Sequence, residues 1–129
     1  VARAVQIAQG TGTLIMGNGD VRDIADAQQK AEETGADGVM LGRAVFGNPW
    51  LFDSAREVGS ISLEEKLRVM IEHTYLFEKT LGDIKNFAIM KKHYKAYVNG
   101  FDGAKELRVK LMDANNAQEV ERIVKESFV

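Results

Sequence analysis

The strongest constraint on the fold is a short apolar segment that ends at a glycine turn and leads into a helical pattern. This order occurs twice, because residues 13–16 (TLIM) precede Gly17-Asn-Gly19, and residues 38–41 (GVML) precede Gly42. Strand, turn and helix repeated in this way are typical of a βαβα unit, whose strands pair in parallel. Two strands are too few for a covered parallel sheet, so the remaining strands are expected upstream of Val1.

Capping signals predict where the helices of this first half begin and end. Residues 1–8 have the pattern of the end of a helix. Asp20 is expected to cap the helix after the first strand, with Asp23 near its positive end. Gly35 is expected to end that helix in the left-handed conformation. The Asn-Pro pair in residues 48–52 predicts a further short helix.

The second half has the pattern of helices joined by short loops. A capping box at residues 62–65 (SLEE) begins a helix whose apolar positions recur every three or four residues. A second helix is expected over residues 83–101, and two shorter ones over 104–112 and 118–128. Asn116 is expected to cap the last of these helices, with Glu119 three residues further on. Such a series predicts a small helical bundle that begins near residues 59–60.

The expected fold class is therefore α/β followed by all-α, with more helix than strand. Residues 1–59 should contain two βα units, and residues 60–129 should form a four-helix bundle-like domain.

Composition excludes several classes of protein. The 129 residues contain no cysteine, so a disulfide framework, a thiolate metal site and a cysteine nucleophile are excluded. The two histidines and scattered carboxylates match no metal-ligand spacing, and no apolar run reaches the roughly 20 residues of a membrane span. The start at Val1 lacks the order of a signal peptide, which favours an intracellular protein, and it suggests a piece cut from a longer chain.

The two glycine turns are candidates for an anion site. A turn after a parallel strand presents free backbone N–H groups beside a helix start, and glycine lets the backbone approach a phosphate closely. Residues 17–20 and the Gly42-Arg43 pair would converge on one anion, to which Arg43 adds a forked cationic donor. The plainer alternative is that the glycines only end strands and start helices. For Gly35 and Gly38 we adopt such a purely structural role in turns.

Positive charge gathers in one segment of an otherwise slightly acidic chain, whose net charge is −2. Residues 84–101 hold four lysines and no acid, and helical geometry predicts that these lysines share one face: Lys85, Lys91, Lys92 and Lys95. The opposite arc is apolar, with His93 between the two. The face could contact a nucleic-acid backbone or could simply be solvated. His73 is expected to be an ordinary helix residue.

These segments together resemble the tRNA-dihydrouridine synthase family. Residues 17–20 (GNGD), 35–44 (GADGVMLGRA) and 47–52 (GNPWLF) resemble the end of that family's barrel. Residues 90–93 (MKKH), Tyr94, Tyr97, Gly100 and Leu107-Arg108 resemble its C-terminal helical domain. The Gly-Arg element occurs in many phosphate-binding barrels, whereas the Gly-Asn-Pro-Trp and Lys-His elements at these spacings are more specific.

The resemblance implies that residues 1–59 are the last two βα units of a (β/α)8 TIM barrel carrying FMN, reduced by NADPH. The activity implied is reduction of the C5–C6 bond of tRNA uridines by a cytoplasmic, monomeric protein. Asn18, Gly19 and Asp20 look like one FMN-phosphate segment, and Gly42 with Arg43 like the other. The helical domain would hold tRNA and present the extruded uridine. The residues expected at RNA are Lys85, Lys91, Lys92, His93, Lys95 and Arg108.

The chain departs from the family in ways that bear on activity. The family's proton donor is a cysteine on an earlier barrel loop, and this chain has none, so no catalytic residue is expected in it and the piece alone should be inactive. Thr13 stands where relatives often have proline. Two alternatives remain: a fragment of another FMN- or phosphate-binding TIM-barrel enzyme, and a non-catalytic RNA-binding module.

Overall fold

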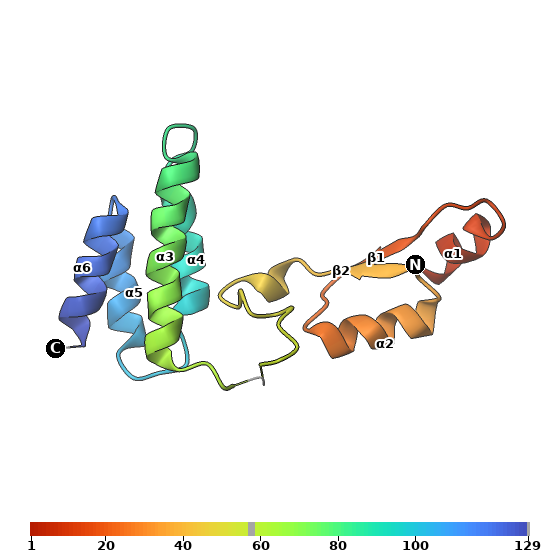
Figure 1. The fold of residues 1–129 in the computed structure, drawn as a ribbon, viewed down its shortest axis with the longest axis horizontal. Helices are drawn as coiled ribbons and strands as arrows, with labels where there is room; N and C mark the ends of the chain where they lie inside the picture. The colour runs from red at the N-terminus through yellow and green to blue at the C-terminus, as the bar shows by residue number, and fades with distance from the viewer. Residues whose placement is uncertain (57–58, 129) are drawn as a thin grey trace. The chain divides into compact units, whose positions relative to one another are not determined.

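The computed structural model describes residues 1–56 and 59–128 (Figure 1). Internal contacts divide the chain into a first unit, Val1–Ala55, and a second unit, Arg56–Val129. The first unit contains α1 (Ala2–Ala8), β1 (Met16–Asn18), α2 (Ile24–Thr34), β2 (Gly38–Met40) and the 3-10 helix η1 (Arg43–Val45). The second contains α3 (Leu63–Leu81), α4 (Ala88–Tyr97), α5 (Ala104–Asp113) and α6 (Ala117–Ser127). The described chain is thus mostly helical, with a small parallel sheet.

The sheet pairs β1 with β2 in parallel, with Met16 opposite Gly38 and Asn18 opposite Met40. The strand predicted over residues 13–16 is therefore wrong in position, because β1 begins where that prediction ends. Ile15 donates its N–H to the Asp37 carboxylate at 2.8 Å and accepts the Asp37 N–H on its carbonyl at 3.0 Å, so it bonds the residue before β2, and the pairing of β1 with β2 starts at Met16. Gly17 does not stop the strand: it is buried and lies against Val39.

The first residue of α2 also differs from the prediction. Asp23, and not Asp20, is the cap: its carboxylate accepts the N–H of Asp26 at 2.8 Å, and the helix begins at Ile24. Asp20 has a positive φ of 46°, which is outside the extended conformation of a capping residue. The predicted end of the helix is confirmed, since Gly35 has a φ of 70° and donates its N–H to the Ala31 carbonyl.

The short helix predicted for residues 48–52 is not formed. Leu51 donates to the Asn48 carbonyl at 3.2 Å and Asp53 donates to the Trp50 carbonyl at 2.9 Å. These bonds span three residues each and make separate turns rather than the continuous i to i+4 ladder of an α-helix. The helical turn lies earlier, at η1, immediately after Gly42.

The second unit is built around one apolar core to which each of α3, α4, α5 and α6 contributes. In it α3 contacts α4 and α6, and α5 contacts the same two helices (Figure 1). The predicted caps are confirmed, because Ser62 accepts the N–H of Glu65 at 3.1 Å and Asn116 accepts the N–H of Glu119 at 2.8 Å. The fully buried side chains of the core include Met70, Met90, Tyr94, Val98, Leu111 and Val120.

The second helix of this unit is shorter than predicted. It spans Ala88–Tyr97 rather than residues 83–101. Residues 82–86 form turns, and the side-chain oxygen of Asn86 accepts the N–H of Ala88 at 2.8 Å, so the helix starts beyond the predicted Asp83. Val98 leaves the helical conformation with a ψ of 81°, which places Phe101 outside the helix.

Candidate functional site

The two predicted phosphate segments lie together in the first unit. One follows β1 (Asn18, Gly19 and Asp20), and the other follows β2 (Gly42 and Arg43). The guanidinium of Arg43 contacts the carboxylate of Asp20, although the two side chains are 81% and 80% exposed. Adjacent parallel strands end at the same edge of a sheet, and this ion pair joins their two turns at that edge. The ion pair is exposed, so its contribution to stability is small and it competes poorly with a ligand.

The glycines of these turns serve different purposes. Gly19 has a φ of 139°, a conformation that L side chains rarely adopt, so its backbone alone requires glycine. Gly42 has an ordinary φ of −105°, and a Cβ placed on it would meet no described atom within 4 Å. Nothing in the described fold therefore demands glycine at position 42. The open space in front of it leaves the backbone accessible to a ligand.

The donors at this edge fit a phosphate group. Arg43 offers a planar cation that matches a phosphate in two-point geometry, and the backbone beside Gly42 is exposed. Asp20 supplies only acceptors when ionised, so its carboxylate holds the guanidinium and does not itself bind an anion. Arg43 can bind a phosphate when the phosphate replaces the Asp20 carboxylate as the partner of its guanidinium.

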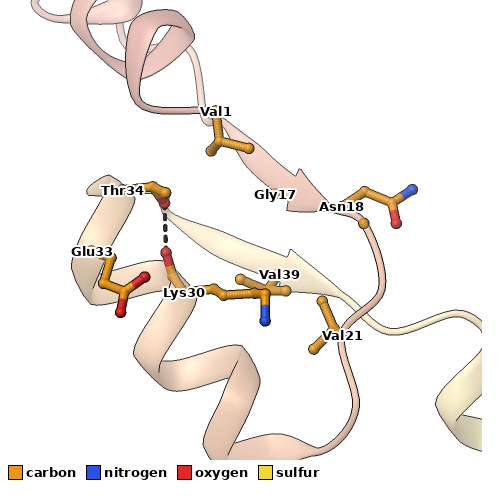
Figure 2. Close-up of a pocket in the computed structure, with 9 residues that line it drawn as sticks. Val1, Gly17, Asn18, Val21, Lys30, Glu33, Thr34 and Val39 are labelled. Atoms are coloured by element: carbon orange, nitrogen blue, oxygen red, sulfur yellow. Dashed lines mark hydrogen bonds between the residues drawn. The ribbon is translucent and has the colours of Figure 1, made fainter.

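A pocket of about 300 Å³ reaches the first of these turns from the α2 side (Figure 2). Its wall includes Asn18 and Gly19, while Val21 and Val39 supply apolar surface. Lys30 lines it as well, but its ammonium bonds the Asp26 carboxylate at 2.5 Å. That bond, with the backbone N–H and the guanidinium of Arg22, holds the pKa of Asp26 well below its usual range. The pocket does not include Gly42 or Arg43, so it is not the phosphate edge itself.

The expected lysine face is only partly formed. Lys92 and Lys95 are exposed on α4, but Lys85 lies in the turns before the helix. Lys91 is half-buried and donates from Nζ to the Met112 carbonyl at 2.6 Å. The prediction that all four lysines share one helix face is therefore wrong, because α4 starts three residues after Lys85 and because Lys91 turns toward α5.

Arg108, the remaining predicted RNA contact, lies on α5. One of its guanidinium nitrogens donates to the Val98 carbonyl at 2.9 Å. That bond ties α5 to the end of α4 and leaves the side chain partly buried. A guanidinium carries five N–H groups, so this bond uses only part of the donor capacity of the fork.

The structure brings together two histidines that the sequence interpretation kept apart. His73 on α3 and His93 on α4 have ring centroids 5.2 Å apart at an interplanar angle of 64°. His73 Nδ1 also lies 3.2 Å from the hydroxyl of Tyr97. His73, expected to be an ordinary helix residue, thus has partners on α4 that are distant in sequence. His73 lies three residues after Met70 and four before Phe77, and both of these residues are buried. This helical spacing is the sequence signal that would have indicated an inward side chain.

Burial is the main cause that lowers the pKa of both histidines. For His73 desolvation is the cause, and for His93 the neighbouring His73 and Lys92 lower the pKa further. Both rings therefore favour the neutral form at neutral pH.

Two other classes of site find no matching residues in the described part of the chain. Within residues 1–56 and 59–128, no cluster of three or more histidine, aspartate and glutamate side chains has the arrangement of a metal site. No helix in that part of the chain has the length and apolar character needed to cross a bilayer.

Comparison with known proteins identifies the family. A family model described as dihydrouridine synthase matches residues 2–129. A protein of Staphylococcus aureus (strain Mu50 / ATCC 700699), named a probable tRNA-dihydrouridine synthase, is 39% identical over 116 residues, covering 88% of this chain and 34% of the relative. A protein of the same name from Aquifex aeolicus (strain VF5) is 30% identical over 115 residues, covering 88% of this chain and 36% of the relative. The chain thus spans about a third of the length of these relatives. The resemblance predicted from the sequence is confirmed: the chain belongs to the dihydrouridine synthase family.

Proposed function

We propose that this chain is part of a flavin-dependent tRNA-dihydrouridine synthase that reduces uridine to dihydrouridine in tRNA. FMN is its redox cofactor and NADPH its reductant. The observation that carries the proposal is the contact of Arg43 with Asp20, which joins the two turns expected to hold the FMN phosphate, in a chain that belongs to this family. FMN, when bound, supplies the hydride chemistry of the reaction.

In this proposal the chain's own residues bind and orient the cofactor. Arg43 pairs with the phosphate, and the backbone at Asn18, Gly19 and Gly42 approaches it closely, with Asp20 orienting the guanidinium. The first unit then corresponds to the last two βα units of a TIM barrel, whose phosphate site is commonly built from the loops after the final strands. No residue of this chain is assigned as the proton donor, so the 129 residues alone should be inactive.

The helical residues 60–129 are proposed to form a four-helix, tRNA-binding domain. Lys92 and Lys95 form the exposed cationic part of α4, and Lys85 lies in the adjacent turns. These ammonium groups would contact phosphates and release counterions, which supplies affinity without reading bases. His93 on α4 and the remaining donors of the Arg108 fork on α5 are the further candidates. Lys91 is a weaker one, since its ammonium is bonded to Met112.

The parent enzyme is proposed to act as a monomer in the cytoplasm. This part of the proposal follows from the location of tRNA substrates and from the family resemblance.

The test is to express the longer protein that contains this chain, record its flavin absorbance, and measure dihydrouridine in tRNA after incubation with NADPH. Bound flavin and NADPH-dependent dihydrouridine are the expected result. Bound flavin without dihydrouridine would favour another FMN-binding barrel enzyme. Tight tRNA binding with neither flavin nor dihydrouridine would favour a non-catalytic RNA-binding module.

A further inference from the structure

The contact between α3 and α4 contains a cluster of His73, His93 and Tyr97, in which the proposed function gives no role to His73 or Tyr97. The two imidazoles meet edge to face, with their ring centroids 5.2 Å apart. Tyr97 also lies on α4, and its ring centroid is 6.0 Å from that of His73. Both histidines are half-buried, while Tyr97 is 3% exposed. A buried phenol needs a hydrogen-bond partner, and His73 Nδ1 lies 3.2 Å away.

The chemistry of Tyr97 indicates the direction of this bond. Burial raises the pKa of the Tyr97 hydroxyl, so the phenol keeps its proton, and in the tautomer of His73 that we adopt, with the ring proton on Nε2, this hydroxyl donates to Nδ1. His73 is thereby fixed in ring orientation and tautomer, in the way that an orienting partner fixes a histidine at many functional sites.

The charges around His93 oppose its protonation in the absence of RNA. On its own helix Lys92 is cationic, and from α3 the partner is His73. Some charged groups of the neighbouring helices have partners of their own. On α6, which packs against α3, Glu121 bonds Tyr75 and Lys125. Next to α5, Lys91 bonds the Met112 carbonyl. An anion arriving beside Lys92 would reverse this balance at His93.

We propose that His73 is a positioning residue for His93, and that the pair takes up one proton when an RNA phosphate binds beside Lys92. The proton resides on His93, which then donates a charge-assisted hydrogen bond to the phosphate. His73 stays neutral, because two adjacent imidazolium rings would repel each other. This inference deepens the RNA contact of α4 and rests on that part of the proposed function.

Proton uptake makes the binding of RNA depend on pH. Because binding takes up one proton, the affinity for RNA falls by up to about tenfold for each unit that the pH rises. This dependence holds in the pH range between the His93 pKa of the free chain and that of the bound chain. Such a dependence distinguishes His93 from lysines, which stay charged throughout this range.

The chain is suited to a direct test, because it contains only two histidines and so gives only two imidazole signals. The experiment is an NMR pH titration of the histidine-labelled 129-residue chain, alone and with an unmodified tRNA transcript. We expect tRNA to raise the pKa of His93 by more than about one unit and to leave His73 low. If tRNA binds and neither pKa moves, the inference is overturned while the RNA contact survives. If tRNA does not bind at all, both are overturned.

Variants of His73 test its positioning role, with circular dichroism to confirm that each is folded. His73→Asn keeps an acceptor near the place of Nδ1, whereas His73→Ala leaves the Tyr97 hydroxyl without it. We expect the asparagine variant to stay near wild-type affinity for tRNA at pH 6, and the alanine variant to bind about tenfold more weakly. His93→Gln should bind with an affinity that no longer changes between pH 6 and 8. Equal affinities for the two His73 variants, or an unaltered pH slope in His93→Gln, would overturn the proposal.

Discussion

The carboxylate of Glu78 on α3 accepts a hydrogen bond of 2.8 Å from the backbone N–H of Ala117, the first residue of α6. Ala117 is fully buried, so this N–H has no access to water. It is one of the N–H groups that a helix start leaves without an intrahelical partner, and an anion there also interacts favourably with the helix dipole. A single side chain thus joins the first and last helices of the second unit.

Glu78→Ala should destabilise the second unit by about 1–3 kcal/mol, because the N–H of Ala117 would remain buried without its acceptor. Urea denaturation followed by circular dichroism measures this loss. Glu72→Ala is the matched control, since Glu72 makes only an exposed pair with Arg68 on the same helix and should cost less than about 1 kcal/mol. Equal losses in the two variants would contradict the special role of Glu78.

Reversing the exposed charges of α4 should weaken tRNA binding. The double variant Lys92→Glu and Lys95→Glu removes two phosphate contacts, so the slope of log affinity against log salt should fall in magnitude by about 1.5–2. Fluorescence anisotropy over a salt series measures both the affinity and the slope. The control makes the same charge change at the exposed Lys105 and Lys110 of α5. If both double variants behaved alike, the effect would reflect net charge and not α4.

Gly42→Ala should separate ligand binding from folding. The added methyl group meets open space, so unfolding free energy should change by no more than about 0.5 kcal/mol. In the longer protein the same methyl group would obstruct the phosphate, and flavin should be lost more readily on dialysis. Gly35→Ala is the opposite case: at a φ of 70° it should destabilise by about 1 kcal/mol. It should leave flavin retention unchanged, because Gly35 ends α2 and belongs to neither turn.

Acid should destabilise the second unit through its histidines. Burial lowers the pKa of His73 and His93 in the folded state, so the unfolded chain binds more protons as the pH falls below the ordinary value of about 6.5. Stability is therefore full above that value and is lost as the pH falls toward the folded-state pKa values. Thermal unfolding at pH 7.5 and pH 5 should show a drop, which shrinks in the variant His73→Asn with His93→Gln. An undiminished drop in that variant would assign the acid sensitivity to other groups.

The features that the sequence predicts correctly depend on residues that are close together in the chain. Ser62 with Glu65, and Asn116 with Glu119, each cap a helix within three residues, and Gly35 ends α2 by its own conformation. These features depend on local backbone chemistry, so a pattern three or four residues long is enough to find them. The pairing of the two apolar segments was predicted for the same reason, since a βαβ unit is itself a local arrangement.

The incorrect predictions involve partners that are distant in sequence. The start of β1 depends on Asp37, which bonds Ile15 from 22 residues away. Lys91 leaves the expected charged face because its acceptor, Met112, lies 21 residues further on. His73 meets His93 only because α3 and α4 pack together. Helical periodicity places a residue on a face, but it does not identify the atom on another helix that its side chain reaches.

Lys91 shows a consequence of such a distant bond for chemical reactivity. Its ammonium rests on a carbonyl in the last turn of α5, where a cation is favoured by the helix dipole, and the side chain is half-buried. The hydrogen bond and the partial burial shield this amine from an acylating reagent. Lys92, its neighbour in the sequence, is exposed. Of two adjacent lysines, one should therefore be acetylated rapidly and the other only when α4 and α5 separate, which makes Lys91 a chemical reporter of their packing.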